Sequence, residues 1–202
     1  LFRNAGQTCV CANRLYIQDG VYDRFAEKLQ QAVSKLQIGD GLQPNVTIGP
    51  LIDEKAIAKV QEHIADALDK GARVATGGKS HELGGNFFQP TILVDVPSDA
   101  KVAKEETFGP LAPLFRFKDE ADVIAQANDT EFGLAAYFYA RDLGRVFRVG
   151  EALEYGIIGI NTGLISTEVA PFGGVKSSGL GREGSKYGIE DYLEIKYMCI
   201  GI

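Results

Sequence analysis

Cys9 is the residue whose type and setting most directly suggest chemistry. It follows Gly6-Gln7-Thr8 and stands just before a short hydrophobic segment. A thiolate is the nucleophilic form of cysteine, and small or polar neighbours let backbone N–H groups point at the sulfur, which favours the anion and any oxyanion formed beside it. A lone cysteine in a glycine-containing loop can equally be a small buried residue. The loop alone therefore predicts a candidate nucleophile with a structural alternative.

The residues around Cys9 resemble the cysteine signature of the aldehyde dehydrogenase superfamily. The matching run is Phe2-x-Asn4-x-Gly6-Gln7-x-Cys9-x-x-x-x-Arg14. Three downstream segments fit the same superfamily, namely Lys104-Glu105-Glu106-Thr107-Phe108-Gly109-Pro110, the segment around Asn161, and Pro171-Phe172-Gly173-Gly174. Within the superfamily, bacterial succinate-semialdehyde dehydrogenases are resembled by Arg3, Cys9-Val10-Cys11 and Gly163-Leu164-Ile165-Ser166.

The resemblance implies oxidation of succinate semialdehyde to succinate with NADP or NAD as the cofactor. Cys9 would attack the aldehyde carbon and form a thiohemiacetal, hydride would pass to the nicotinamide, and water would hydrolyse the resulting thioester. The backbone N–H of Cys9 would be one oxyanion donor. The general base and the side-chain oxyanion donor of the superfamily would lie outside this chain.

Three residues are assigned to the substrate. Arg3 lies six residues before Cys9, and its planar guanidinium suits a carboxylate. By resemblance, Arg3 and Ser166 would bind the distal carboxylate of the aldehyde, and Phe172 would wall the aldehyde tunnel. The structural alternatives are a surface salt bridge for Arg3, a turn hydroxyl for Ser166 and a core position for Phe172. Another semialdehyde acid, such as glutarate semialdehyde, is the alternative substrate.

Two residues are assigned to the cofactor. By resemblance, Glu106 would accept hydrogen bonds from ribose hydroxyls and Phe108 would support the nicotinamide ring. Without the resemblance, Glu105 and Glu106 would read as a solvated pair. Cys11 also has two readings: it either packs beside the loop or forms a reversible, strained disulfide with Cys9.

The composition is ordinary for a soluble globular protein. The 202 residues carry a net charge of −6, with 45% hydrophobic and 24% charged residues. The basic residues are scattered, and no apolar run reaches the roughly 18 residues that cross a bilayer, so neither nucleic acid nor a membrane is an expected partner. Three cysteines without zinc-type spacing predict a reducing cytoplasm and no metal site.

Helical and strand patterns alternate along the chain. Apolar residues at three- and four-residue steps predict helices over residues 21–36 and 53–71, and they leave His63 on a solvated face. Further helices are predicted at 119–127 and 142–153, and strands at 15–18, 72–76, 111–117, 134–140 and 157–161. Pro90 places the extended run 87–96 near a sheet edge. We therefore predict an α/β fold, Rossmann-like, with a largely parallel sheet and helices on both faces.

The predicted organisation is a catalytic domain over residues 1–187 and a C-terminal oligomerisation strand over 188–202, giving a homodimer or homotetramer. The sequence opens in mid-motif and has no Gly-rich dinucleotide fingerprint. We therefore expect a C-terminal fragment that lacks an N-terminal cofactor domain and is inactive alone. Rival hypotheses are a cysteine hydrolase pairing Cys9 with His63 or His81, and an inert, self-associating fragment.

Overall fold

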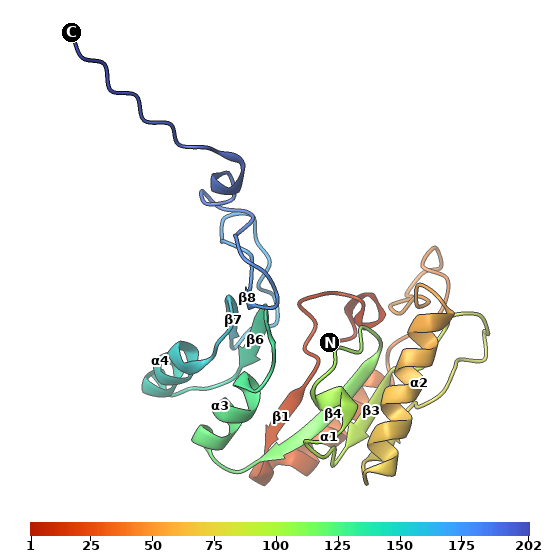
Figure 1. Ribbon diagram of the computed structural model, residues 1–202. Helices are drawn as coiled ribbons and strands as arrows, with labels where there is room; N and C mark the ends of the chain where they lie inside the picture. Colours follow the sequence, from red (N-terminus) through yellow and green to blue (C-terminus); the bar gives the residue numbers. More distant parts are fainter. The chain divides into compact units, whose positions relative to one another are not determined.

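The chain forms two compact units, Leu1–Gln126 and Ala127–Ile202. They are described by a computed structural model that covers residues 1–202 (Figure 1). The first unit contains β1 (Leu15–Gln18), α1 (Tyr22–Val33), α2 (Glu54–Asp69), β2 (Arg73–Thr76), β3 (Thr91–Val94) and β4 (Leu111–Phe117). Helix α3 (Glu120–Asn128) crosses the division, and the second unit contains β5 (Phe132–Gly133), β6 (Ala135–Phe138), α4 (Leu143–Ala152), β7 (Ile157–Ile160) and β8 (Val175–Lys176). None of the helices has both the length and the apolar character that crossing a membrane requires.

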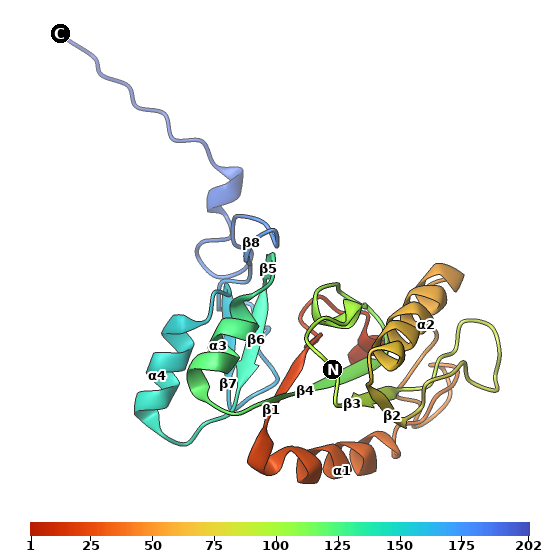
Figure 2. The same ribbon diagram turned by 60° about the horizontal axis from the view of Figure 1, so that its bottom comes forward.

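The first unit is built on a four-stranded sheet in the order β1-β4-β3-β2. Strand β4 pairs in parallel with β1 and with β3, and only β2 runs antiparallel to its neighbour. Successive strand residues point to opposite faces, so Ile92 and Leu114 pack on the side of α1, whereas Leu93 and Leu111 pack on the side of α2. Figure 2 shows the two helices on opposite faces of this sheet. The predicted α/β fold with helices on both faces is confirmed.

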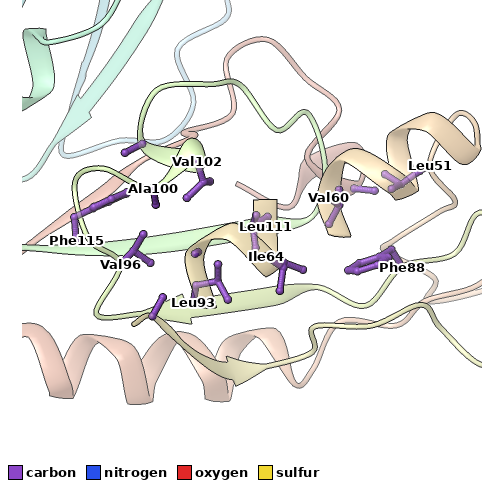
Figure 3. Packing of buried hydrophobic residues seen from close by; sticks show 14 of the residues in the cluster. Leu51, Val60, Ile64, Phe88, Leu93, Val96, Ala100, Val102, Leu111 and Phe115 are labelled. Carbon is purple, nitrogen blue, oxygen red and sulfur yellow. The ribbon is translucent and has the colours of Figure 1, made fainter. Parts of the chain in front are cut away.

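The larger of the two apolar cores lies between α2 and the sheet. Val60, Ile64 and Ala67 recur at helical spacing on α2 and are at most 5% exposed. Figure 3 shows Ile64 of α2 beside Leu93 and Leu111 of the sheet. Burying an aliphatic side chain contributes about 1.5–3 kcal/mol, so this face fixes α2 firmly, and with it the residues that α2 presents to the neighbouring loops.

Three predicted helix starts have the expected capping geometry. The Asp53 carboxylate accepts the Ala56 backbone N–H at 2.8 Å, and the Asp142 carboxylate accepts that of Arg145 at 2.7 Å. Asp119 accepts the Asp122 N–H at 2.9 Å in the same way. Such a cap satisfies a backbone donor that has no partner inside the helix.

The second unit holds two small sheets. Strands β6 and β7 pair in parallel, and β5 pairs antiparallel with β8. Lys176 of β8 ties this region together, because its ammonium donates to the carbonyls of Asn128 and Thr130 and pairs with Glu154 at 2.5 Å. After η4 (Glu190–Tyr192), residues 193–202 are exposed and form no helix or strand. The association role predicted for this tail stays a prediction.

Two local predictions were wrong. Strand β3 does not lie near an edge but inside the sheet, between β4 and β2. Pro90 stands just before the strand, where its missing N–H interrupts no ladder. His63 is not solvated: it is fully buried, because the loop after η3 (Lys101–Ala103) covers that side of α2. In addition, α1 ends at Val33, three residues before the predicted end.

A buried tyrosine joins α1 to the middle of β4 and to the residue that follows β3. The Tyr22 side chain is 1% exposed, and its hydroxyl donates to the Leu114 carbonyl at 3.0 Å and accepts the Asp95 N–H at 2.7 Å. The Arg116 guanidinium stacks 3.7 Å from the Tyr22 ring centre and pairs with Asp95. Hydrogen bonds from Arg73, and then from Arg116, hold the pKa of Asp95 below its usual range.

Replacing Tyr22 with phenylalanine should lower the free energy of unfolding by about 1–3 kcal/mol, because it leaves the partly buried Asp95 N–H without its acceptor. The Leu114 carbonyl loses one of its donors but keeps the Val96 N–H at 3.2 Å. Urea unfolding of the two proteins, followed by circular dichroism, measures the difference. Tyr139→Phe is the matched control, since Tyr139 is 73% exposed. Equal losses in both variants would contradict the role assigned to the Tyr22 hydroxyl.

Candidate active site

The loop that carries Cys9 begins with a tight left-handed reversal. Asn4, Ala5 and Gly6 have φ values of 51°, 55° and 77°. Non-glycine residues rarely adopt this region, and each costs about 1–3 kcal/mol unless its surroundings hold it. Here Asn4 and Gln7 hold it: the Gln7 N–H donates to the Asn4 carbonyl at 3.0 Å, and the Asn4 amide donates to the Gln7 carbonyl at 3.1 Å.

Gln7 also anchors the loop to the start of α2. Its side-chain oxygen accepts the Ile52 N–H at 2.9 Å, and its amide nitrogen donates to the Pro50 carbonyl at 3.3 Å. One side chain thus bonds both a donor and an acceptor of a segment more than forty residues away. The position of the Cys9 loop is therefore set by the elements around α2.

Cys9 lies at the exposed tip of this loop. A turn closes around it, because the Cys11 N–H donates to the Thr8 carbonyl at 2.8 Å. The Cys9 backbone N–H donates to no protein group in the structure, so it is available to an oxyanion. Cys11 is half-buried, and its thiol lies 3.8 Å from the Arg3 carbonyl. All three cysteines are free thiols.

The segment with Glu106 and Phe108 packs directly against the Cys9 loop. A Cβ atom placed on Gly6 would lie 2.0 Å from the Gly109 carbonyl oxygen, so the two backbones meet where only glycine fits. Glu106 is exposed, and the structure shows no hydrogen bond to its carboxylate. Phe108 is 41% exposed and has a left-handed φ of 52°, a strained conformation for an aromatic residue.

A small cavity lies between the two loops. Gly6, Thr8 and Cys11 line one side, and Glu106 and Phe108 line the other. Its volume is about 10 Å³, which suits a single water molecule and not an aldehyde or a nicotinamide. The first unit thus brings Cys9, Glu106 and Phe108 onto neighbouring loops without itself enclosing a substrate pocket.

The three substrate residues are divided between the units. Arg3 is exposed in the first unit and forms no ion pair within it. Ser166 lies exposed in the second unit, on the segment between β7 and β8. Phe172, in the same unit, is half-buried and pairs with Glu183 through two backbone hydrogen bonds of 2.8 Å.

Sequence comparison identifies the family. The sequence pattern of the aldehyde dehydrogenase family matches residues 1–198. The chain belongs to the aldehyde dehydrogenase family. A protein of Escherichia coli (strain K12) named succinate-semialdehyde dehydrogenase (NADP+) is 89% identical over 100% of this chain and 42% of its own length.

Two further proteins show the same partial coverage. A Pseudomonas aeruginosa protein named glutarate-semialdehyde dehydrogenase is 76% identical over 99% of this chain and 41% of its own length. The crystal structure of succinate-semialdehyde dehydrogenase from Burkholderia pseudomallei superposes with a TM-score of 0.98 at 66% identity, covering 100% of this chain and 42% of that one. The chain therefore spans less than half the length of these aldehyde dehydrogenases, and its Rossmann-like α/β fold is theirs.

Asn13 is a residue of this aldehyde dehydrogenase chain for which the sequence predicted no role. Its side-chain amide donates to the Glu105 carbonyl at 2.9 Å, and its side-chain oxygen accepts the Thr107 N–H at 3.1 Å. The sequence signal was a side-chain amide four residues after Cys9, because Asn and Gln can bond a backbone donor and acceptor at once. The partners are more than ninety residues away in sequence, and nothing local indicates them.

His63 is the second such residue. Its Nδ1 lies 2.9 Å from the Thr107 hydroxyl and its Nε2 lies 3.3 Å from the Glu105 carboxylate. Burial lowers the pKa of His63, and Glu105 only partly opposes this. Both ring nitrogens are engaged away from Cys9.

The rival cysteine hydrolase therefore has no histidine partner in this aldehyde dehydrogenase chain. His63 bonds only Thr107 and Glu105, and the His81 ring accepts the Leu83 N–H at 3.3 Å within its own turn. A cysteine–histidine pair needs the two side chains within hydrogen-bond reach. The structure brings neither histidine to Cys9.

Proposed function

We propose that this chain is the nucleophile-bearing part of an NADP+-dependent succinate-semialdehyde dehydrogenase. One observation supports this most directly: Cys9 stands exposed on a loop that packs against the segment of Glu106 and Phe108. The Escherichia coli relative, at 89% identity, carries that name and specifies NADP+. Three free thiols suit a reducing compartment, and we place the enzyme in the cytoplasm.

In the proposed reaction, the Cys9 thiolate forms a bond to the aldehyde carbon, and the carbonyl oxygen becomes an oxyanion. The free backbone N–H of Cys9 stabilises that charge. Bound NADP+ would supply the hydride acceptor for that carbon. The Cys9 thioester that remains is hydrolysed to the carboxylic acid, which returns the thiol. The general base for the water is assigned to the part of the relatives that this chain does not cover.

The side chains of the first unit fit a nicotinamide cofactor by their chemistry. The Glu106 carboxylate is exposed and unbonded, so it can accept hydrogen bonds from ribose hydroxyls. The exposed ring of Phe108 offers an apolar face to the nicotinamide. We assign no phosphate-binding residue to this chain, because it has no Gly-rich strand–turn–helix fingerprint.

We assign Arg3 and Ser166 to the distal carboxylate of the substrate. Both side chains are exposed, and Arg3 has no carboxylate partner in the chain. Phe172 is assigned to the wall of the aldehyde tunnel. Glutarate semialdehyde is the second candidate substrate, since a relative at 76% identity carries that name. One additional methylene typically changes kcat/KM by about 10–200-fold, so assays of both semialdehydes decide between them.

The overall activity is tested by joining the chain to the part of the Escherichia coli relative that it does not cover. We expect the joined protein to reduce NADP+ with succinate semialdehyde and the chain alone to be inactive. Cys9→Ser should lower kcat of the joined protein by about 1,000-fold or more. Cys11→Ser is the matched control and should retain activity. Activity in the Cys9→Ser variant, or in the chain alone, would contradict the proposal.

The carboxylate assignment is tested by Arg3→Leu in the joined protein. A charge-assisted hydrogen bond contributes about 1.5–3 kcal/mol, so KM for succinate semialdehyde should rise about 10–100-fold. KM for an uncharged aldehyde of similar length, such as butanal, should stay within about twofold. An equal rise for both aldehydes would mean that Arg3 does not recognise the carboxylate.

We further propose that the tail after Tyr187 holds subunits together as a homodimer or homotetramer. Its apolar side chains are exposed in the single chain; Ile195 is 99% exposed and Tyr197 is 85% exposed. An uncovered β-prone segment pairs readily with another chain. Truncating the joined protein after Tyr187 should yield monomer or aggregate on a sizing column with light scattering. An unchanged oligomer would rule out the tail as the contact.

A further inference from the structure

The segment Glu105-Glu106-Thr107 is held on both sides of Glu106. The backbone carbonyl of Glu105 and the backbone N–H of Thr107 bond the Asn13 amide at 2.9 and 3.1 Å. The side chains of the same two residues bond His63 at 3.3 and 2.9 Å. Each flank of Glu106 therefore has one bond to the Cys9 loop and one to α2.

The proton positions at His63 follow from its surroundings. Burial lowers the pKa of His63, so the ring is neutral near pH 7 and carries one N–H. The Glu105 carboxylate can only accept a hydrogen bond, so Nε2 carries that proton. Nδ1 then accepts the hydroxyl proton of Thr107, which is 3% exposed. The ring thus bonds both flanking residues in one orientation.

Glu106 has no comparable anchor of its own. Its carboxylate is exposed and unbonded, so the direction of its side chain depends on the backbone of residues 105–107. On the C-terminal side, Phe108 is in the left-handed region, and Gly109 fits tightly against Val60 of α2. A loop whose residues on both sides of Glu106 are hydrogen-bonded suits a preorganised contact, because the ordering cost is then met before the ligand binds.

We propose that Asn13 and His63 are positioning residues that set Glu106 for the cofactor ribose. Asn13 also ties the position of this contact to the nucleophile, which lies four residues before it on the same loop. The proposal rests on the assignment of Glu106 to the cofactor. It makes two polar side chains, the buried His63 and the half-buried Asn13, determinants of cofactor affinity through the position of Glu106.

A structural role alone makes a different prediction. If Asn13 and His63 only stabilised the fold, their loss would lower the melting temperature without separating the kinetic constants of the two substrates. Ile64→Val supplies that comparison, since Ile64 neighbours His63 on α2, is 5% exposed and packs only in the apolar core. It should lower the melting temperature and leave both KM values unchanged.

The kinetic test uses the joined protein with Asn13→Ala, His63→Leu and His63→Gln. In the first two variants, KM for NADP+ should rise at least fivefold, while KM for succinate semialdehyde stays within twofold. His63→Gln should recover to within twofold of the parent, because a glutamine amide can again donate to Glu105 and accept from Thr107. An unchanged KM for NADP+, or equal rises in both KM values, overturns the proposal.

A second readout does not depend on turnover. Without cofactor, the Thr107 amide should exchange with D2O at least tenfold faster in Asn13→Ala than in the parent or in Ile64→Val, because it loses its acceptor. If the Thr107 amide exchanges at the same rate in Asn13→Ala as in the parent, the positioning role of Asn13 is overturned. Glu106→Gln distinguishes the cofactor contact from the positioning role: if it leaves KM for NADP+ unchanged, both fail. If it raises that KM while Asn13→Ala does not, only the positioning role fails.

Discussion

The contact between Gly6 and Gly109 is the constraint on which the arrangement of the first unit depends. The two backbones approach so closely that a Cβ on Gly6 would lie 2.0 Å from the Gly109 carbonyl oxygen. Gly6 also ends a left-handed run that would strain other residues. Together with the two Asn13 hydrogen bonds, this contact fixes the separation of the loops that carry Cys9 and Glu106, which lie more than ninety residues apart in sequence. The strain at Asn4 and Phe108 is tolerated because this packing holds both loops.

Helix α2 connects the loop of Glu106 and Gly109 to the apolar core. One face of α2 packs Ile64 against the sheet, while His63 and Val60 meet the loop that ends at Gly109. A buried polar side chain costs free energy unless its hydrogen bonds are made, and both ring nitrogens of His63 have partners. The rigidity of the core is therefore transmitted to the loop through one imidazole and one close van der Waals contact.

The fold was predictable where local patterns carry the information. Strand β4 matches the predicted residues 111–117 even though Pro113 lies within it, because its ladder with β3 ends at Pro113 and its ladder with β1 begins at Leu114. The helices predicted to begin at Asp53, Asp119 and Asp142 do start there, and each aspartate caps its first turn. The placement of β3 and of His63 failed for one reason: an edge strand or a solvated face is defined by what covers it, and the covering segment is distant in sequence.

The residues of the candidate site differ in the same way: some have a role that depends on their own side chain, and others have a role that depends on partners distant in sequence. The roles predicted for Cys9 and Arg3 rest on the chemistry of their own side chains, which the structure leaves exposed. Gln7 and Asn13 lie in the same signature, yet their side-chain amides bond backbone groups of remote loops. Arg14 likewise donates to the Tyr16 hydroxyl and the Gln126 carbonyl. A signature read as a list of catalytic residues therefore mixes two kinds of constraint. The exposed members are the ones proposed to carry the chemistry, and the amides fix the loop against its neighbours.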